Sequence, residues 1–115
     1  MDETLYITGL THGGRTLVGG LWTMWAQEGF PLELSQIALR DQGHDPDWAE
    51  AMADASRTGN CPALMTQLEA LLPEGDLLNL KAGFMRIVAS GVSWDAFLKT
   101  KRQNGEKYLQ SANCK

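Results

Sequence analysis

The chain has 115 residues, of which 43% are hydrophobic and 21% are charged, and its net charge is -4. This length and composition suit one globular domain, and they argue against two independent cores and against intrinsic disorder. No apolar run approaches the roughly 18 residues that span a bilayer, and Met1–Thr4 is acidic where a secretory signal is basic. We therefore expect a cytoplasmic protein of a prokaryote or its phage that does not bind membranes.

The first fourteen residues alternate poorly between apolar and polar and end at Gly13-Gly14. A lone strand is unstable without a partner, and no partner strand is evident in the rest of the sequence. Unpaired chain ends are loosely held. We therefore expect residues 1–14 to form a loosely structured arm that lies over the helices.

Helical periodicity begins at about Arg15, where apolar residues start to recur at spacings of three and four. Glycine commonly ends a helix and proline suits its first turn, so both residue types mark boundaries. The predicted fold class is all-α: a compact bundle of five or six short helices in one domain over 1–115, with a partly frayed tail at 103–115. The expected helices are 15–28, 31–42, 46–57, 62–72, 77–90 and 94–102.

The first two helices carry signals for their starts and faces. Gly19 and Gly20 each weaken the first helix by about 1 kcal/mol relative to alanine, unless they mark its true start. In the second helix, the spacing predicts that Leu34, Ile37 and Ala38 form the inner face, with Leu39 as a further candidate.

The fifth helix has a clean amphipathic pattern, with apolar residues at steps of three, four, three and one. The inner stripe that this spacing predicts is Leu77, Leu80, Phe84, Ile87 and Val88.

The segment Asp45-Pro46-Asp47-Trp48 is the best helix start in the chain. Asp45 can accept hydrogen bonds from the free amides, Pro46 fits the first turn, and Asp47 opposes the helix dipole. The sixth helix should end at Asn104-Gly105, because both residues favour a helix terminus.

The net charge conceals a division along the chain. Residues 1–76 contain three basic and twelve acidic residues, a net charge of -9, whereas residues 77–115 contain seven basic and two acidic residues, a net charge of +5. Such an asymmetry can indicate a segment that binds a partner.

Four tryptophans are many for this length, and two of them, Trp22 and Trp25, lie three residues apart along one helix edge. Large aromatic side chains often fill the core of a small bundle, but tryptophan is also enriched at binding hot spots. Since Leu21 and Trp25 already occupy the inner face, Trp22 is the tryptophan most expected at the surface.

Motifs for catalysis and metal binding are weak. His44, Asp45 and Cys61 supply the residue types of a hydrolase, but nothing in their spacing singles them out. Asp41 and Asp47 add carboxylates near His44, without the alternating spacing of a calcium loop or the four ligands of a structural zinc. We expect no enzyme activity, no metal and no cofactor, with a small hydrolase as a third hypothesis.

The two cysteines, Cys61 and Cys114, are too few for a disulfide framework in a domain of this size. We expect reduced thiols, with a single bridge between them as the alternative in an oxidising compartment.

Nucleic-acid binding is the alternative function. The acidic helix 46–57 would repel phosphate, whereas the helices within 81–107 are electrostatically suitable. The overall negative charge argues against a dedicated nucleic-acid protein. The basic residues of this alternative are Lys81, Arg86, Lys99, Lys101, Arg102 and Lys107.

The leading hypothesis is a non-enzymatic helical interaction module, a small adaptor or regulator that binds a protein partner or a second copy of itself. The acidic segment from Asp41 to Asp54 would attract a basic partner surface or the basic tail of a second copy. The residues predicted to bind are Trp22 and Trp25 through apolar contact, and Lys99, Lys101 and Arg102 through charge.

Overall fold

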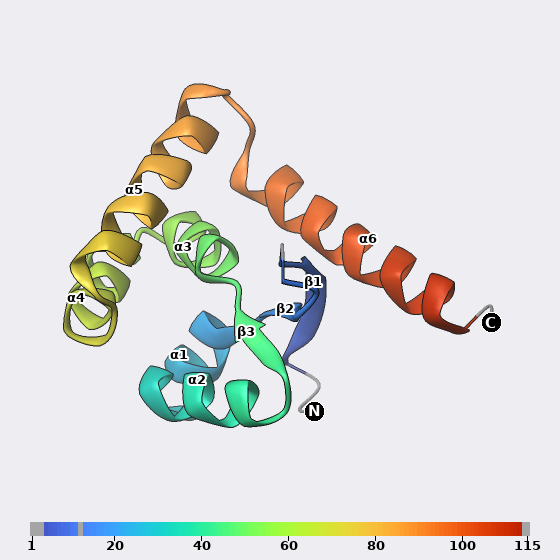
Figure 1. The fold of residues 1–115 in the computed structure, drawn as a ribbon. Coiled ribbons are helices and arrows are strands. Elements are labelled where there is room, and N and C mark those ends of the chain that lie inside the picture. The colour runs from blue at the N-terminus through green and yellow to red at the C-terminus, as the bar shows by residue number, and fades with distance from the viewer. Residues whose placement is uncertain (1–3, 12, 114–115) are drawn as a thin grey trace.

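The computed structural model describes residues 4–11 and 13–113, with side chains described as far as Lys107. Figure 1 shows a small sheet surrounded by helices, with the long C-terminal helix crossing above it. The strands are β1 (Tyr6–Leu10), β2 (Thr16–Gly19) and β3 (His44–Pro46). The helices are α1 (Leu21–Glu28), α2 (Leu32–Asp41), α3 (Trp48–Arg57), α4 (Cys61–Leu71), α5 (Glu74–Ala89) and α6 (Trp94–Asn113).

The mostly helical prediction is confirmed, since 67% of the structure is helix, but the sheet means that the fold is not all-α. Within the described ranges, β2 is the central strand; it pairs antiparallel with β1 and parallel with β3. No helix among the described residues is long and apolar enough to cross a membrane.

The expected loose arm is instead the first strand of a hairpin. Its partner is Thr16–Gly19, which the periodicity had assigned to the first helix. Thr16 and Val18 are β-branched and favour a strand, and Gly14 adopts a positive φ in the turn that closes the hairpin. Residues 1–3 and 12 of the expected arm lie outside the described residues.

Helix α1 begins at Leu21, so the two glycines mark its true start. Gly20 is the N-cap residue, with φ of 99°. A Cβ atom at Gly20 would collide with the carbonyl oxygen of Thr4, so only glycine fits where the chain before β1 passes this turn.

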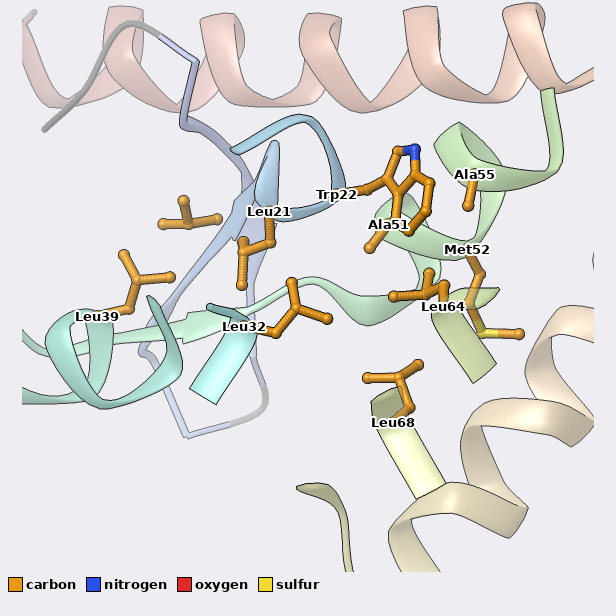
Figure 2. Close-up of a cluster of buried hydrophobic side chains, with 10 residues drawn as sticks. Leu21, Trp22, Leu32, Leu39, Ala51, Met52, Ala55, Leu64 and Leu68 are labelled. Atoms are coloured by element: carbon orange, nitrogen blue, oxygen red, sulfur yellow. The ribbon is translucent and has the colours of Figure 1, made fainter. Parts of the chain in front are cut away.

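Trp22 lies in the core, with 6% of its surface exposed, and the prediction that it lies at the surface is wrong. Figure 2 shows its indole directed toward Ala51 and Ala55 of α3, whose small side chains leave room for it. Trp25 is partly buried and contacts Trp22, with ring centroids 5.1 Å apart. The core cluster comprises Val18, Leu21, Trp22, Leu32, Leu39, Ala51, Met52, Ala55, Leu64 and Leu68.

Helix α2 presents a different face to the core from the one that its spacing predicted, and of the predicted residues only the further candidate Leu39 is buried. Leu32 and Leu39 are buried, whereas Leu34 and Ile37 are each 50% exposed and Ala38 is exposed as well. Leu32 and Leu39 are seven residues apart, and this spacing fits the helical period as well as the spacing of Leu34, Ile37 and Ala38 does. The contacts of α2 with α1 and β3 decide between the two faces.

The third and sixth helices also differ from prediction at one end each. The N-cap of α3 is Asp47, since Asp45 and Pro46 belong to β3. Helix α6 passes through Asn104 and Gly105 without a break and continues to Asn113. Gly105 is buried, and a Cβ atom there would collide with the carbonyl oxygen of Ile7. Glycine therefore lets α6 approach the backbone of β1 closely instead of ending the helix.

The thiol of Cys61 is free and partly buried at the start of α4. Cys114 lies outside the described residues, as does any bridge to it.

Candidate functional site

Three buried carboxylates line one face of α3. Asp47, Glu50 and Asp54 lie three and four residues apart, so they share the side of the helix that faces β1, α1 and α6. Their residues are between 2% and 7% exposed. Burying a carboxylate is costly unless hydrogen bonds or opposite charges compensate it, so the partners of each one define the site.

Asp47 is fully compensated. Its Oδ2 atom accepts a hydrogen bond from the Thr8 hydroxyl at 2.6 Å and binds the Lys101 ammonium at 2.9 Å. Its Oδ1 atom accepts the backbone N–H of Glu50 at 3.1 Å, which caps α3. Thr8 reaches Asp47 because a bulge between Ile7 and Gly9 places an extra residue in β1.

Glu50 accepts two hydrogen bonds, from the Tyr6 hydroxyl at 2.5 Å and from the backbone N–H of Gly20 at 2.9 Å. Burial raises the pKa of Glu50, and the charges of Asp54 and Asp47 add to that rise, although the two hydrogen bonds oppose it. Burial, followed by the charge of Glu50, also raises the pKa of Tyr6. Tyr6 therefore acts as a hydrogen-bond donor to Glu50.

Asp54 binds Thr23 and Arg57. The hydroxyl of Thr23 donates to its Oδ2 atom at 2.8 Å, and the guanidinium of Arg57 donates to its Oδ1 atom at 3.0 Å. Arg57 also lies 3.6 Å from Asp95 of α6. Asp54 is thus tied to α1 by a hydrogen bond and, through Arg57, to α6 by ion pairs.

A polar cavity of about 210 Å³ opens between these elements, and we call it the α3 pocket. Glu50 and Asp54 form one part of its wall, and Arg57 and Arg102 supply positive charge. The guanidinium of Arg102 stacks over the Tyr6 ring, 4.1 Å from its centroid. The complete lining is Thr4, Tyr6, Gly20, Thr23, Glu50, Asp54, Arg57, Leu98 and Arg102.

The structure separates the basic residues that the sequence grouped together. Lys101 is bound to Asp47, Arg102 lies at the α3 pocket, and Lys99 is exposed on the outer side of α6. The acidic segment of the chain thus meets the basic C-terminal helix within one molecule, where the sequence predicted an encounter between molecules.

The residues of the nucleic-acid alternative lie on two helices. Lys81 and Arg86 are exposed on α5, and Lys107 is exposed on α6, where the acidic residues Asp95 and Glu106 are exposed as well. Nucleic-acid binding stays a prediction, and this mixture of charges gives it no added support.

The residues of the hydrolase hypothesis have other partners. Asp45 pairs with Arg15 at 3.0 Å and Arg40 at 4.0 Å, and the Nδ1 atom of His44 contacts the Thr16 hydroxyl across the sheet. No hydrogen bond links His44, Asp45 and Cys61 in the part of the chain that the structure describes. Nor do three or more histidine, cysteine or acidic side chains converge there as ligands for a metal ion.

Helix α5 presents a second candidate surface. Its residues Leu77, Leu80 and Phe84 pack against the core, as their spacing predicted, yet no residue of the helix is fully buried. Val88 was predicted to lie on the same inner stripe, and this is wrong, because 45% of its surface is exposed where the end of the helix extends beyond the core. One flank of the helix carries Leu78 and Met85, each of which directly follows an inner residue and was not part of the predicted inner stripe. The exposed apolar residues of this region are Leu78 at 59%, Met85 at 61%, Val88 at 45% and Val92 at 47%.

Comparisons with protein-family models, with curated proteins and with solved structures gave no match.

Proposed function

We propose that this protein is a non-enzymatic interaction module that self-associates through the outer face of α5. We define the outer face as Leu78, Met85 and Val88 of the helix with Val92 just beyond its end. The observation that carries the proposal is that these four side chains are between 45% and 61% exposed, although each is apolar and large.

The spacing of the outer face suits a helix partner. Leu78, Met85 and Val88 follow one another at seven and three residues, which is the spacing of the contact seam between packed helices. Scattered apolar residues on a surface are ordinary, but a contiguous stripe marks an interaction site. Figure 1 shows α5 at the edge of the molecule, with α3 beside it and α4 at its lower end, and the exposure of the four apolar side chains leaves them accessible to a partner.

The charges of α5 favour a second copy as that partner. Glu74 and Asp76 lie in its first turn, whereas Lys81 and Arg86 are the charged residues of the remainder. Two copies of α5 that pack antiparallel bring the acidic end of each helix beside the basic part of the other. A two-fold dimer is the commonest symmetric assembly of this kind.

The experiment compares the oligomeric state of the parent with that of a double variant, Leu78→Lys with Met85→Lys, by sedimentation equilibrium. We expect the parent to form dimers and the variant to be monomeric, because four lysines would be buried in the interface. The matched control is Leu34→Lys with Ile37→Lys, which changes two equally exposed side chains of α2 and should leave the dimer intact. A parent that is monomeric at about 1 mM, a concentration at which even weak complexes form, would contradict the proposal.

The antiparallel arrangement has its own test in the same measurement. Glu74→Lys with Asp76→Lys should weaken the dimer, and adding Lys81→Glu with Arg86→Glu should restore it, because the opposite charges then face each other again. Circular dichroism verifies that each variant keeps its helix content. Failure of the fourfold variant to recover would contradict the antiparallel arrangement of the two helices.

A further inference from the structure

The α3 pocket brings fixed charges of both signs to one small cavity, and it lies apart from the outer face of α5. Its carboxylates come from α3, whereas Arg102 comes from α6 and Tyr6 from β1. Structural ion pairs usually neutralise one another completely. A ligand would therefore bind to those charged groups of the pocket whose donors or acceptors are not fully used.

Arg102 supplies the positive charge that is unused. No carboxylate of the described residues forms an ion pair with its guanidinium, which stacks on the Tyr6 ring. Stacking holds the plane of the guanidinium and leaves its N–H groups at the edge, where they can bind a carboxylate with two parallel hydrogen bonds. Arg57 is less suited to this role, because Asp54 and Asp95 already neutralise it.

Asp54 and Glu50 supply the complementary acceptors. Each of their four oxygen atoms accepts one hydrogen bond from Thr23, Arg57, Tyr6 or Gly20. A carboxylate oxygen has two lone pairs, so each atom retains the capacity for a second bond. An ammonium group, which offers three donors, fits these acceptors.

We propose that the α3 pocket binds a small zwitterion, an α-amino acid, with its carboxylate on Arg102 and its ammonium group on Asp54 and Glu50. The volume of about 210 Å³ lies below the roughly 300–1,000 Å³ of sites for drug-sized ligands, so the ligand is small. Leu98 is the apolar part of the wall, and it contacts the side chain of the amino acid. A neutral molecule or a simple anion would use only half of these groups.

The experiment is isothermal titration of the parent with each of the twenty amino acids, and with acetate and methylammonium chloride as probes that carry one charge each. We expect at least one amino acid to saturate the protein at a ratio of one, and both single-charge probes to bind far more weakly. Arg102→Gln should lower the affinity for that amino acid by about tenfold or more, because the charged hydrogen bonds to its carboxylate are lost. Arg86→Gln, which removes an exposed arginine of α5 outside the pocket, is the matched control and should bind as the parent does.

Several outcomes would overturn this assignment. If none of the twenty amino acids binds at a ligand concentration of about 10 mM, the pocket is not an amino-acid site. If acetate binds as tightly as the best amino acid, the pocket is a simple anion site. Equal binding by Arg102→Gln and the parent would place the ligand elsewhere. Because Arg102 is exposed, its variant should fold, and an unchanged melting temperature verifies this. The titration is repeated on the Leu78→Lys, Met85→Lys variant, so that binding is judged whether or not the protein self-associates.

Discussion

The two long helices, α5 and α6, follow one another in the chain and yet attach to the body by different means. Helix α6 is held by specific groups: Leu98 is buried, Lys101 binds a buried carboxylate, and Gly105 touches the backbone of β1. Helix α5 is held by the partial burial of apolar side chains such as Leu80 and Phe84, and none of its residues is completely buried.

This contrast has consequences for how each helix tolerates change. A charge pair and a steric contact have one correct geometry, so they determine the register of α6 on the sheet. Apolar contact is non-directional and scales with area, so α5 is held less specifically. Single substitutions on the inner side of α6 should therefore be costly, whereas α5 can offer its outer face to a partner.

The largest effect should come from Lys101→Met, which keeps the length of the side chain but removes its charge. Asp47 is 4% exposed, and removing one partner of a buried ion pair leaves an uncompensated charge. We expect the free energy of unfolding to fall by about 3 kcal/mol, measured by urea denaturation.

Two further variants make that prediction specific. Lys99→Met changes an exposed lysine two positions earlier and should alter stability by less than about 0.5 kcal/mol. Adding Asp47→Asn to Lys101→Met should restore much of the loss, because asparagine still caps α3 without burying a charge. If Lys101→Met and Lys99→Met proved equally stable, the ion pair would not hold α6 in place.

A smaller loss should follow from Gly105→Ala. The added methyl group meets the carbonyl oxygen of Ile7, so α6 must shift away from β1, at a cost of about 2 kcal/mol. The same change at Gly83 of α5 meets only the end of the Arg86 side chain at 3.9 Å, and we expect it to raise stability by up to about 1 kcal/mol through helix propensity. Thermal unfolding of both variants checks that the melting temperature falls for Gly105→Ala and rises for Gly83→Ala. A gain at both positions would show that α6 does not depend on close contact at Gly105.

The smallest effect concerns the pH dependence of the polar groups beneath α6. The pKa of Glu50 is raised from its ordinary value of 4.5 by burial. Below pH 4.5 Glu50 is protonated in both the folded and the unfolded states. As the pH rises above 4.5, Glu50 ionises in the unfolded state before it ionises in the folded state, so the folded protein loses stability. Glu50→Gln removes this titration; its amide oxygen can still accept the Gly20 N–H, and its NH2 group can donate to the Tyr6 oxygen in place of the bond that Tyr6 now donates. Its melting temperature relative to the parent should therefore rise as the pH increases above about 4.5.

The control for this titration is Glu69→Gln on the exposed side of α4, whose melting temperature should follow that of the parent because its carboxylate remains hydrated. A difference between Glu50→Gln and the parent that stays constant with pH would contradict the prediction.

Sequence reasoning located the six helices because their signals are local. Leu77, Leu80 and Phe84 of α5 were predicted from spacing alone, since residues three and four apart share a face, but the same spacing also selected Val88, which is exposed. The same rule selected Leu34 and Ile37 in α2 ahead of Leu39, whereas Leu32 and Leu39 fit the period equally well and are the leucines that the fold buries. Periodicity therefore identifies a helix more reliably than the side that it buries.

The candidate sites were predicted only in part, because their residues come from distant segments. Arg102 was selected for its charge, and it does lie at the α3 pocket. Tyr6 and Glu50 are 44 positions apart and Asp47 and Lys101 are 54 apart, so no local pattern pairs them. The one sequence signal for their meeting was the opposite net charge of 1–76 and 77–115, which we interpreted as a signal for an external partner.

The sequence by itself determined the helical character of this protein and most of its helix boundaries, because caps, prolines and apolar spacings act within a few residues. Only the tertiary structure decided that Thr16–Gly19 is a strand, that α6 continues past Gly105, and that the buried acids of α3 bind α6 of the same chain. Each of these outcomes depends on a partner that is distant in sequence, and the free energy of burying an apolar surface or a charge is set by that partner.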